Sequence, residues 1–126
     1  MKKDLEEKSK ITSTKKEIED CITQWTEVFG LTDWNITYDL SGRDDSSNAT
    51  MHFKILPRSA HIIFNENLKD YSPVIIHELI HLLMADIEDY VKDLVDKNIP
   101  KNQQEFILSR YDTLLEIFTH KISQIF

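Results

Sequence analysis

Residues 72–97, SPVIIHELIHLLMADIEDYVKDLVDK, contain the longest apolar run of the chain and decide its fold. Pro73 suits the first turn of a helix, because its missing N–H would have no partner there. The pattern predicts a helix over this whole stretch, which Asn98 and Pro100 end. The apolar run, which stops at Ala85, is too short to cross a membrane.

This helix contains an HExxH motif, His77-Glu78-Leu79-Ile80-His81. Residues four apart lie one above the other on a helix, so the two imidazoles can share one metal ion. Glu78 lies beside them and can take a proton from a metal-bound water, whose pKa zinc lowers to about 7. Apolar residues surround the motif, and polar side chains on a buried helix lose hydration. We therefore favour a site that binds one Zn2+ per chain over a pair of core histidines whose only role is to form hydrogen bonds within the protein.

A third protein ligand must come from outside this helix. Glu88 shares the face of the histidines, but it lies about 10 Å further along the axis at about 1.5 Å per residue. The metzincin extension would require a histidine where this chain has Ile87, which excludes that class. The last helix offers four candidate ligands: Glu105, Asp112, Glu116 and His120.

The sequence on either side of the motif predicts an α+β domain. An amphipathic helix spans residues 15–29. Alternation of apolar and polar residues then predicts strands at 34–40, 51–55 and 61–65. After the motif helix, a last helix runs from about residue 102 to 126. The order is an N-terminal helix, a small three-stranded sheet, the active-site helix and a C-terminal helix.

Two segments are predicted to lack regular structure. The turn-rich residues 41–48, SGRDDSSN, form a loop. Residues 1–14 are rich in Lys, Glu, Ser and Thr and are expected to be flexible. This leaves residues 15–126 as a single domain.

Composition argues against several classes of partner. The chain has 126 residues, with 15 basic against 22 acidic side chains and a net charge of −7. This acidic balance disfavours nucleic acid, which needs a basic face. The first ten residues, MKKDLEEKSK, lack the apolar stretch of a signal peptide, and the lone Cys21 suits a reducing compartment. We expect a cytoplasmic protein without a membrane partner.

Four segments together resemble a known family: WNITYDL (34–40), AHIIFNE (60–66), VIIHELIHLLMADIEDYV (74–91) and YDTLLEIFTHKI (111–122). The chain is similar to the small metallopeptidases common in phages and prophages, within the zincin-like superfamily and near the minimal gluzincins. The resemblance implies a zincin-like minimal domain in a bacterial or phage-infected cell. It also implies a helix packed on a small sheet, whose edge strand can pair with an extended peptide.

The resemblance further implies an acidic third ligand in the last helix, followed four residues later by an acid that orients a ligand histidine. Asp112 and Glu116 have this spacing, although the family carries Glu where this chain has Asp112. We take Asp112 as the third ligand and Glu116 as its alternative. An ideal helical wheel places both away from the apolar stripe. The expected edge strand binds substrate through His61, Ile62, Ile63, Phe64 and Asn65.

Three functions use these residues. The first is a zinc metallopeptidase that hydrolyses a peptide or protein substrate, with Glu78 as general base. The alternative is a non-catalytic, zinc-stabilised phage or prophage accessory protein that acts by protein binding. Zinc-dependent hydrolysis of a non-peptide amide would need the same side chains. The sequence defines neither the cleavage specificity nor the oligomeric state.

Overall fold

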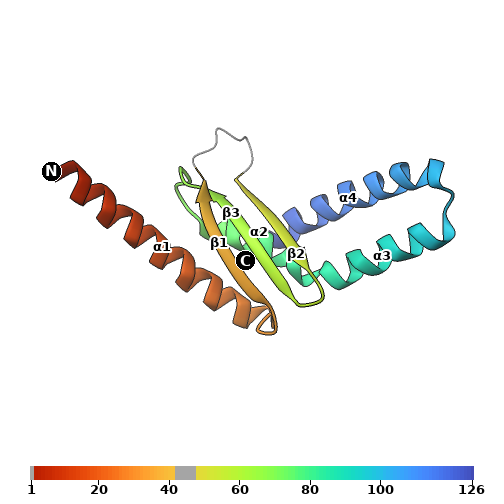
Figure 1. The fold of residues 1–126 in the computed structure, drawn as a ribbon, viewed down its shortest axis with the longest axis horizontal. Coiled ribbons are helices and arrows are strands. Elements are labelled where there is room, and N and C mark those ends of the chain that lie inside the picture. Colours follow the sequence, from red (N-terminus) through yellow and green to blue (C-terminus); the bar gives the residue numbers. More distant parts are fainter. Residues whose placement is uncertain (1, 42–47) are drawn as a thin grey trace.

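The structure, a computed structural model, describes the backbone of residues 2–41 and 48–126, and the side chains of residues 14–41 and 48–126. Over these residues the chain is an α+β protein with four helices and a three-stranded mixed sheet, which confirms the predicted class (Figure 1). The elements are α1 (Lys2–Val28), β1 (Asn35–Ser41), β2 (Ala49–Lys54), β3 (Ser59–Asn65), α2 (Ser72–Leu83), α3 (Ala85–Asn98) and α4 (Lys101–Ser123). None of the described helices has the length and hydropathy that a membrane crossing requires.

β3 is the central strand of the sheet, whose order is β1-β3-β2. β1 pairs with it in parallel, with Tyr38 opposite Ile62, and β2 pairs antiparallel, with His52 opposite His61. The prediction of an edge strand at 61–65 is therefore wrong. Alternating burial identifies a strand but says nothing of its neighbours, and the backbone groups on both sides of β3 already belong to ladders. The open edges of the described sheet are β1 and β2.

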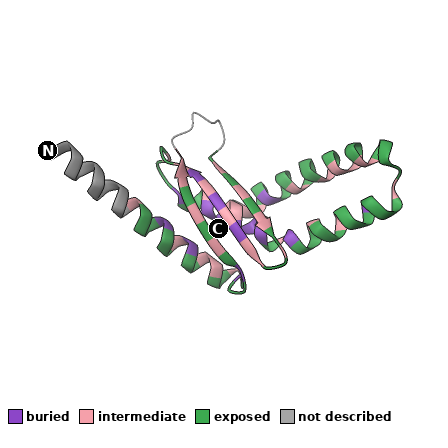
Figure 2. Cartoon of the chain, viewed as in Figure 1, coloured by how far each residue is buried: buried purple, intermediate pink, exposed green. Residues whose placement is uncertain are grey.

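Helices cover one face of this sheet (Figures 1 and 2). Ile62 and Phe64, two residues apart on β3, are fully buried in one cluster with Ile75 and Leu79 of α2 and Ile18 of α1. Each such side chain contributes roughly 1.5–3 kcal/mol of burial free energy. The core thus fixes α2, which carries the HExxH motif, against the sheet.

The single helix predicted for residues 72–97 is two helices in the structure. Met84, at φ −94° and ψ 3°, separates α2 from α3, and its N–H donates to the carbonyl oxygens of Ile80 (3.2 Å) and His81 (3.1 Å). No glycine or proline marks the break, so it could not be predicted from the local sequence. α1 also begins at Lys2 rather than residue 15. Within the predicted loop at 41–48, residues 42–47 lie outside the described residues.

α3 and α4 form a helical hairpin that extends beyond the sheet (Figure 1). The Gln104 side-chain amide fastens the turn, donating to the carbonyl oxygen of Ile99 at 2.8 Å and, at 3.4 Å, to that of Val95. From this turn α4 runs back along α3, and its second half packs against α2. The hairpin therefore returns the chain to the HExxH motif.

Thr119 on α4 is fully buried, and its Oγ1 has no hydrogen-bond partner among the described residues. An unpaired buried hydroxyl costs about 1–3 kcal/mol, and valine keeps its shape without the polar atom. We predict that Thr119→Val raises the free energy of unfolding by about 1 kcal/mol, measured by urea denaturation. The control is Thr113→Val, because the exposed Thr113 donates to the Ser109 carbonyl at 3.0 Å. A loss of stability in Thr119→Val would show that this hydroxyl has a partner.

Candidate metal centre

α2 presents both histidines of the motif on one side. Their ring centroids lie 4.9 Å apart, and the side chains of His77 and His81 are 25% and 18% exposed. The apolar residues between and around them, such as Leu79 and Ile80, are buried and hold the helix in place. The imidazoles therefore reach the surface from a helix that cannot rotate freely.

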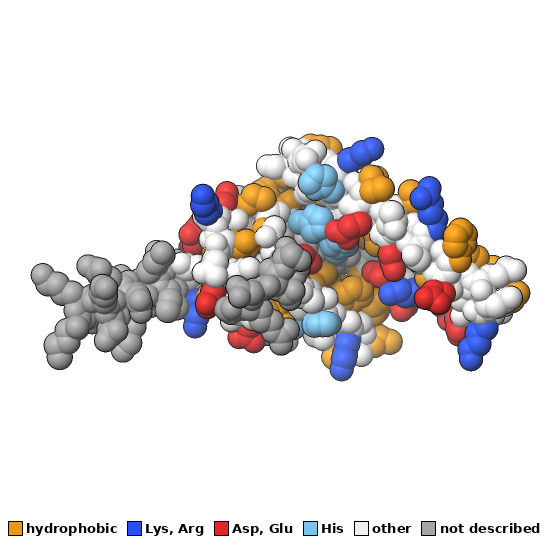
Figure 3. Space-filling view, turned by 90° about the horizontal axis from the view of Figure 1, so that it is seen from above, with side chains coloured by type: hydrophobic (Ala, Val, Ile, Leu, Met, Phe, Trp, Pro, Cys, Tyr) orange, Lys and Arg blue, Asp and Glu red, His pale blue; other side chains and the backbone are white. Residues whose placement is uncertain are grey.

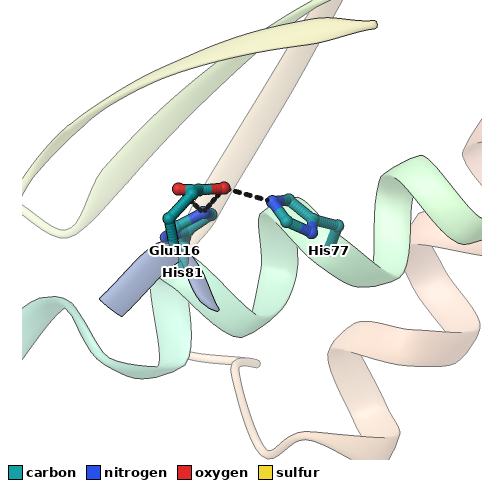
Figure 4. A group of neighbouring side chains, drawn as sticks. All are labelled: His77, His81 and Glu116. Carbon is teal, nitrogen blue, oxygen red and sulfur yellow. Dashed lines mark hydrogen bonds and ion pairs between the residues drawn. The ribbon is translucent and has the colours of Figure 1, made fainter. Parts of the chain in front are cut away.

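Glu116 of α4 meets both imidazoles (Figure 4). Its Oε1 accepts from His77 Nε2 at 2.8 Å, and its Oε2 lies 3.0 Å from His81 Nε2. Candidate ligand atoms of the three residues all lie within 4.8 Å of one another. The Glu116 side chain is 59% exposed, so the cluster is open to solvent. The space-filling view shows histidine and acidic side chains together at the surface (Figure 3).

The charge of Glu116 is stabilised in this position. Burial opposes its ionisation, but the hydrogen bonds from His77 and His81, together with the positive charge they can carry, outweigh this effect. The pKa of Glu116 therefore lies below its ordinary value. A carboxylate is available as an anionic ligand at neutral pH.

The donor set fits zinc. Two imidazoles and one carboxylate form a common ligand set for a catalytic zinc ion, with a fourth position left for water or substrate. Ligand atoms of a tetrahedral ion with bonds of about 2.0–2.1 Å lie roughly 3.3 Å apart. From Glu116 Oε1, the distances to Nε2 of His77 and of His81 are 2.8 and 3.3 Å, which agree with this spacing within about half an ångström.

Asp112, the preferred third ligand from the sequence, is not part of this cluster. It lies about one turn earlier on α4, four residues or about 6 Å along the axis, where the helix passes α3. There its negative charge acts on Lys92 and Tyr111. The position of the α3–α4 turn decides which acid reaches α2, and it favours the alternative, Glu116.

Glu78 lies beside the cluster, largely buried in the wall of a cleft that His77 and Glu116 also line. Burial raises the pKa of its carboxyl to about 7. The charge of His81 lowers this pKa, but not enough to cancel the effect of burial, and the charge of Glu116 raises it further. A carboxyl with such a pKa can accept or release a proton near neutrality. This is the property required of the predicted general base.

The cleft has a volume of about 480 Å³ and lies between the sheet and the end of α4. Asn48 and Ala49, at the start of β2, form its sheet side. His120 lines it from α4, one turn after Glu116. Asn48 and Ala49 could not be predicted as cleft residues, because alternation cannot show which strand of a sheet is an edge.

The substrate-binding residues predicted on β3 do not lie at this cleft. Ile62 and Phe64 are fully buried in the core. His61 is on the opposite face of the sheet, where its Nδ1 is 2.7 Å from Thr37 Oγ1 and its Nε2 is 3.1 Å from Asp39 Oδ2. The prediction that residues 61–65 bind the substrate is therefore wrong. β3 is the central strand, so its backbone groups already pair with β1 and β2 and cannot pair with a peptide.

Comparisons of the chain with protein-family models, with curated proteins and with solved structures find no match.

The raised pKa of Glu78 predicts a pH-dependent stability in metal-free protein. The unfolded carboxyl ionises near its ordinary pKa of 4.5, whereas the folded one stays protonated up to about 7. The contribution of Glu78 to stability is therefore complete below pH 4.5 and is lost as pH rises to about 7. We expect Glu78→Gln to become more stable relative to the wild type over this range, by on the order of 3 kcal/mol.

Chemical denaturation at pH 4.5, 6 and 8 in the presence of a chelator measures this difference. Glu27→Gln, at an exposed glutamate of α1, provides the baseline for the same chemical change. A difference between wild type and Glu78→Gln that stays constant with pH would contradict the raised pKa.

Proposed function

We propose that the chain is a zinc-dependent metallopeptidase of the zincin-like, minimal gluzincin type. The observation that carries the proposal is the convergence of His77, His81 and Glu116 within 4.8 Å, beside the largely buried Glu78. Two helices, α2 and α4, which α3 separates in the sequence, supply these groups, so their meeting does not follow from local sequence spacing. The arrangement provides three ligands and a separate base, as metal-assisted hydrolysis requires.

Glu78 has the central role in the reaction. As the oxygen of a water molecule attacks the carbonyl carbon of the peptide bond, the Glu78 carboxylate takes a proton from that water. When the carbon–nitrogen bond breaks, Glu78 returns the proton to the leaving amine. The bound zinc would supply Lewis acidity, which polarises the substrate carbonyl and lowers the pKa of water. His77, His81 and Glu116 would hold it.

The substrate strand would lie along β2. Among the described strands it pairs only with β3, on one side, and its first residue, Ala49, lines the cleft with Glu78. An extended peptide can add to such an edge by backbone hydrogen bonds, largely independently of its sequence. β2 thus takes the role that the sequence analysis gave to residues 61–65.

Zinc affinity tests the ligand set. We expect about one zinc per chain after dialysis, measured by elemental analysis. Glu116→Ala should weaken zinc binding more than 100-fold, because losing a residue that only orients a ligand costs about 10–100-fold. Asp112→Ala is the matched control one turn away and should retain most of the affinity. Equal losses in the two variants would contradict the assignment of Glu116.

The rate of peptide hydrolysis tests the role of Glu78 as the general base. Glu78→Gln should keep its zinc and its fold but lose roughly 10²–10⁴ in the rate of cleavage of a peptide library, because the amide cannot accept the proton. Glu66→Gln, which replaces a glutamate outside the cleft, is the control. A zinc-loaded wild type that cleaves no peptide would contradict the peptidase proposal. It would favour the accessory protein, or the hydrolysis of another amide.

A further inference from the structure

The α3–α4 hairpin carries an apolar face that the rest of the described chain does not cover. Six large side chains on it are between 42% and 77% exposed. We name them the hairpin face: Ile87, Tyr90 and Leu94 of α3, and Phe106, Leu114 and Phe118 of α4. Most of the hairpin surface is exposed in Figure 2.

All six residues lie on the same side of the hairpin. Each immediately precedes a residue that is at least half-buried, as Leu94 precedes Val95 on α3 and Leu114 precedes Leu115 on α4. Consecutive residues on a helix are turned by about 100°, and reversing a helix reverses the direction of that turn. In an antiparallel pair of helices, the residues that immediately precede those facing the other helix therefore lie on the same side of the pair.

The candidate metal centre lies on the other side of the hairpin. Glu116 follows Leu115 in the sequence, so it points away from the hairpin face by the same geometry. A partner on this face would leave the cleft open. The inference is thus independent of the proposed function.

The exposed apolar area is large enough for a stable interface. With about 200 Å² for each large side chain, the exposed fractions of the six residues amount to roughly 700 Å² per chain. This exceeds the largest apolar patch of a typical monomer, about 300–600 Å². Two such faces would bury roughly 1,400 Å², within the range of about 1,200–2,000 Å² for specific interfaces.

We propose that the hairpin face binds a second copy of this chain, forming a symmetric dimer with a four-helix interface. One face meeting itself is the usual arrangement in homodimers, and two helical hairpins can pack in this way. The position of Arg110 then indicates how the two hairpins cross.

The outer edge of α3 carries two ion pairs: Asp93 lies 3.0 Å from Lys97 Nζ, and Asp86 lies 2.9 Å from the guanidinium of Arg58. Arg110 is exposed between Phe106 and Leu114 on the hairpin face and forms no ion pair with any described residue. A two-fold axis parallel to the helices places α3 of one copy over α4 of the other. Since Gln104 lies opposite Val95, Arg110 would then be within about one turn of Asp93 of the other copy and would join its pair with Lys97.

Sedimentation equilibrium over 1–200 μM protein tests the proposal. We expect a mass of about 30 kDa, twice that of the 14.9 kDa chain, at the upper concentrations. Tyr90→Asp should raise the dimer dissociation constant at least 100-fold, because symmetry places the substitution in the interface twice. The control is Leu56→Asp, at a side chain that is 91% exposed outside the hairpin. It should leave the dissociation constant unchanged.

A charge exchange tests the orientation. Arg110→Asp alone should weaken the dimer. Adding Asp93→Arg and Lys97→Asp in the same chain should restore it, because the pairs of residue 93 with residues 97 and 110 are then rebuilt with reversed sign. Circular dichroism verifies that each variant is folded. A chain that stays at 14.9 kDa throughout, or a dimer that Tyr90→Asp does not weaken, would overturn the proposal. Failure of the triple variant to recover would overturn the antiparallel crossing of α3 on α4.

Discussion

The meeting of Glu116 with His77 and His81 is the contact on which the arrangement of this molecule depends. The two nitrogen–oxygen distances, 2.8 and 3.0 Å, join α2 to a helix that begins eighteen residues after α2 ends. An exposed ion pair alone contributes little to stability, about 0–1 kcal/mol. The packing of α4 on α2 and α3 must therefore hold the carboxylate in place, and the contact reports the register of that packing.

Much of the fold could be predicted from the sequence because its elements have clear periodicities. The alternation along residues 34–40 and 61–65 identified strands, and the HExxH motif identified the helix that faces the sheet. The break at Met84 could not be predicted, since neither glycine nor proline causes it. The strand order could not be predicted either, because each strand shows the same alternation whether it is central or at an edge.

The candidate site likewise has residues that could be predicted from the sequence and one that could not. His77, Glu78 and His81 lie within five consecutive residues of one helix, so local geometry fixes their arrangement and the sequence was sufficient to place them together. The choice between Asp112 and Glu116 depends on the length of α3 and the turn at Gln104, which no local pattern encodes. Both acids lie off the apolar stripe of α4. The structure explains why this does not exclude Glu116: the cluster is at the surface, and that side chain is 59% exposed.

The distance in sequence between His77 and Glu116, 39 residues, has a thermodynamic consequence. An ion bound by both would join α2 to α4 across all of α3, and its ligands come together only in the folded chain. It would act as a reversible cross-link of the folded state, and the free energy of unfolding would rise with the concentration of free metal. Removing the ion would then weaken the attachment of α4 to α2 as well as empty the site, so a chelator would lower the denaturant concentration at which the chain unfolds.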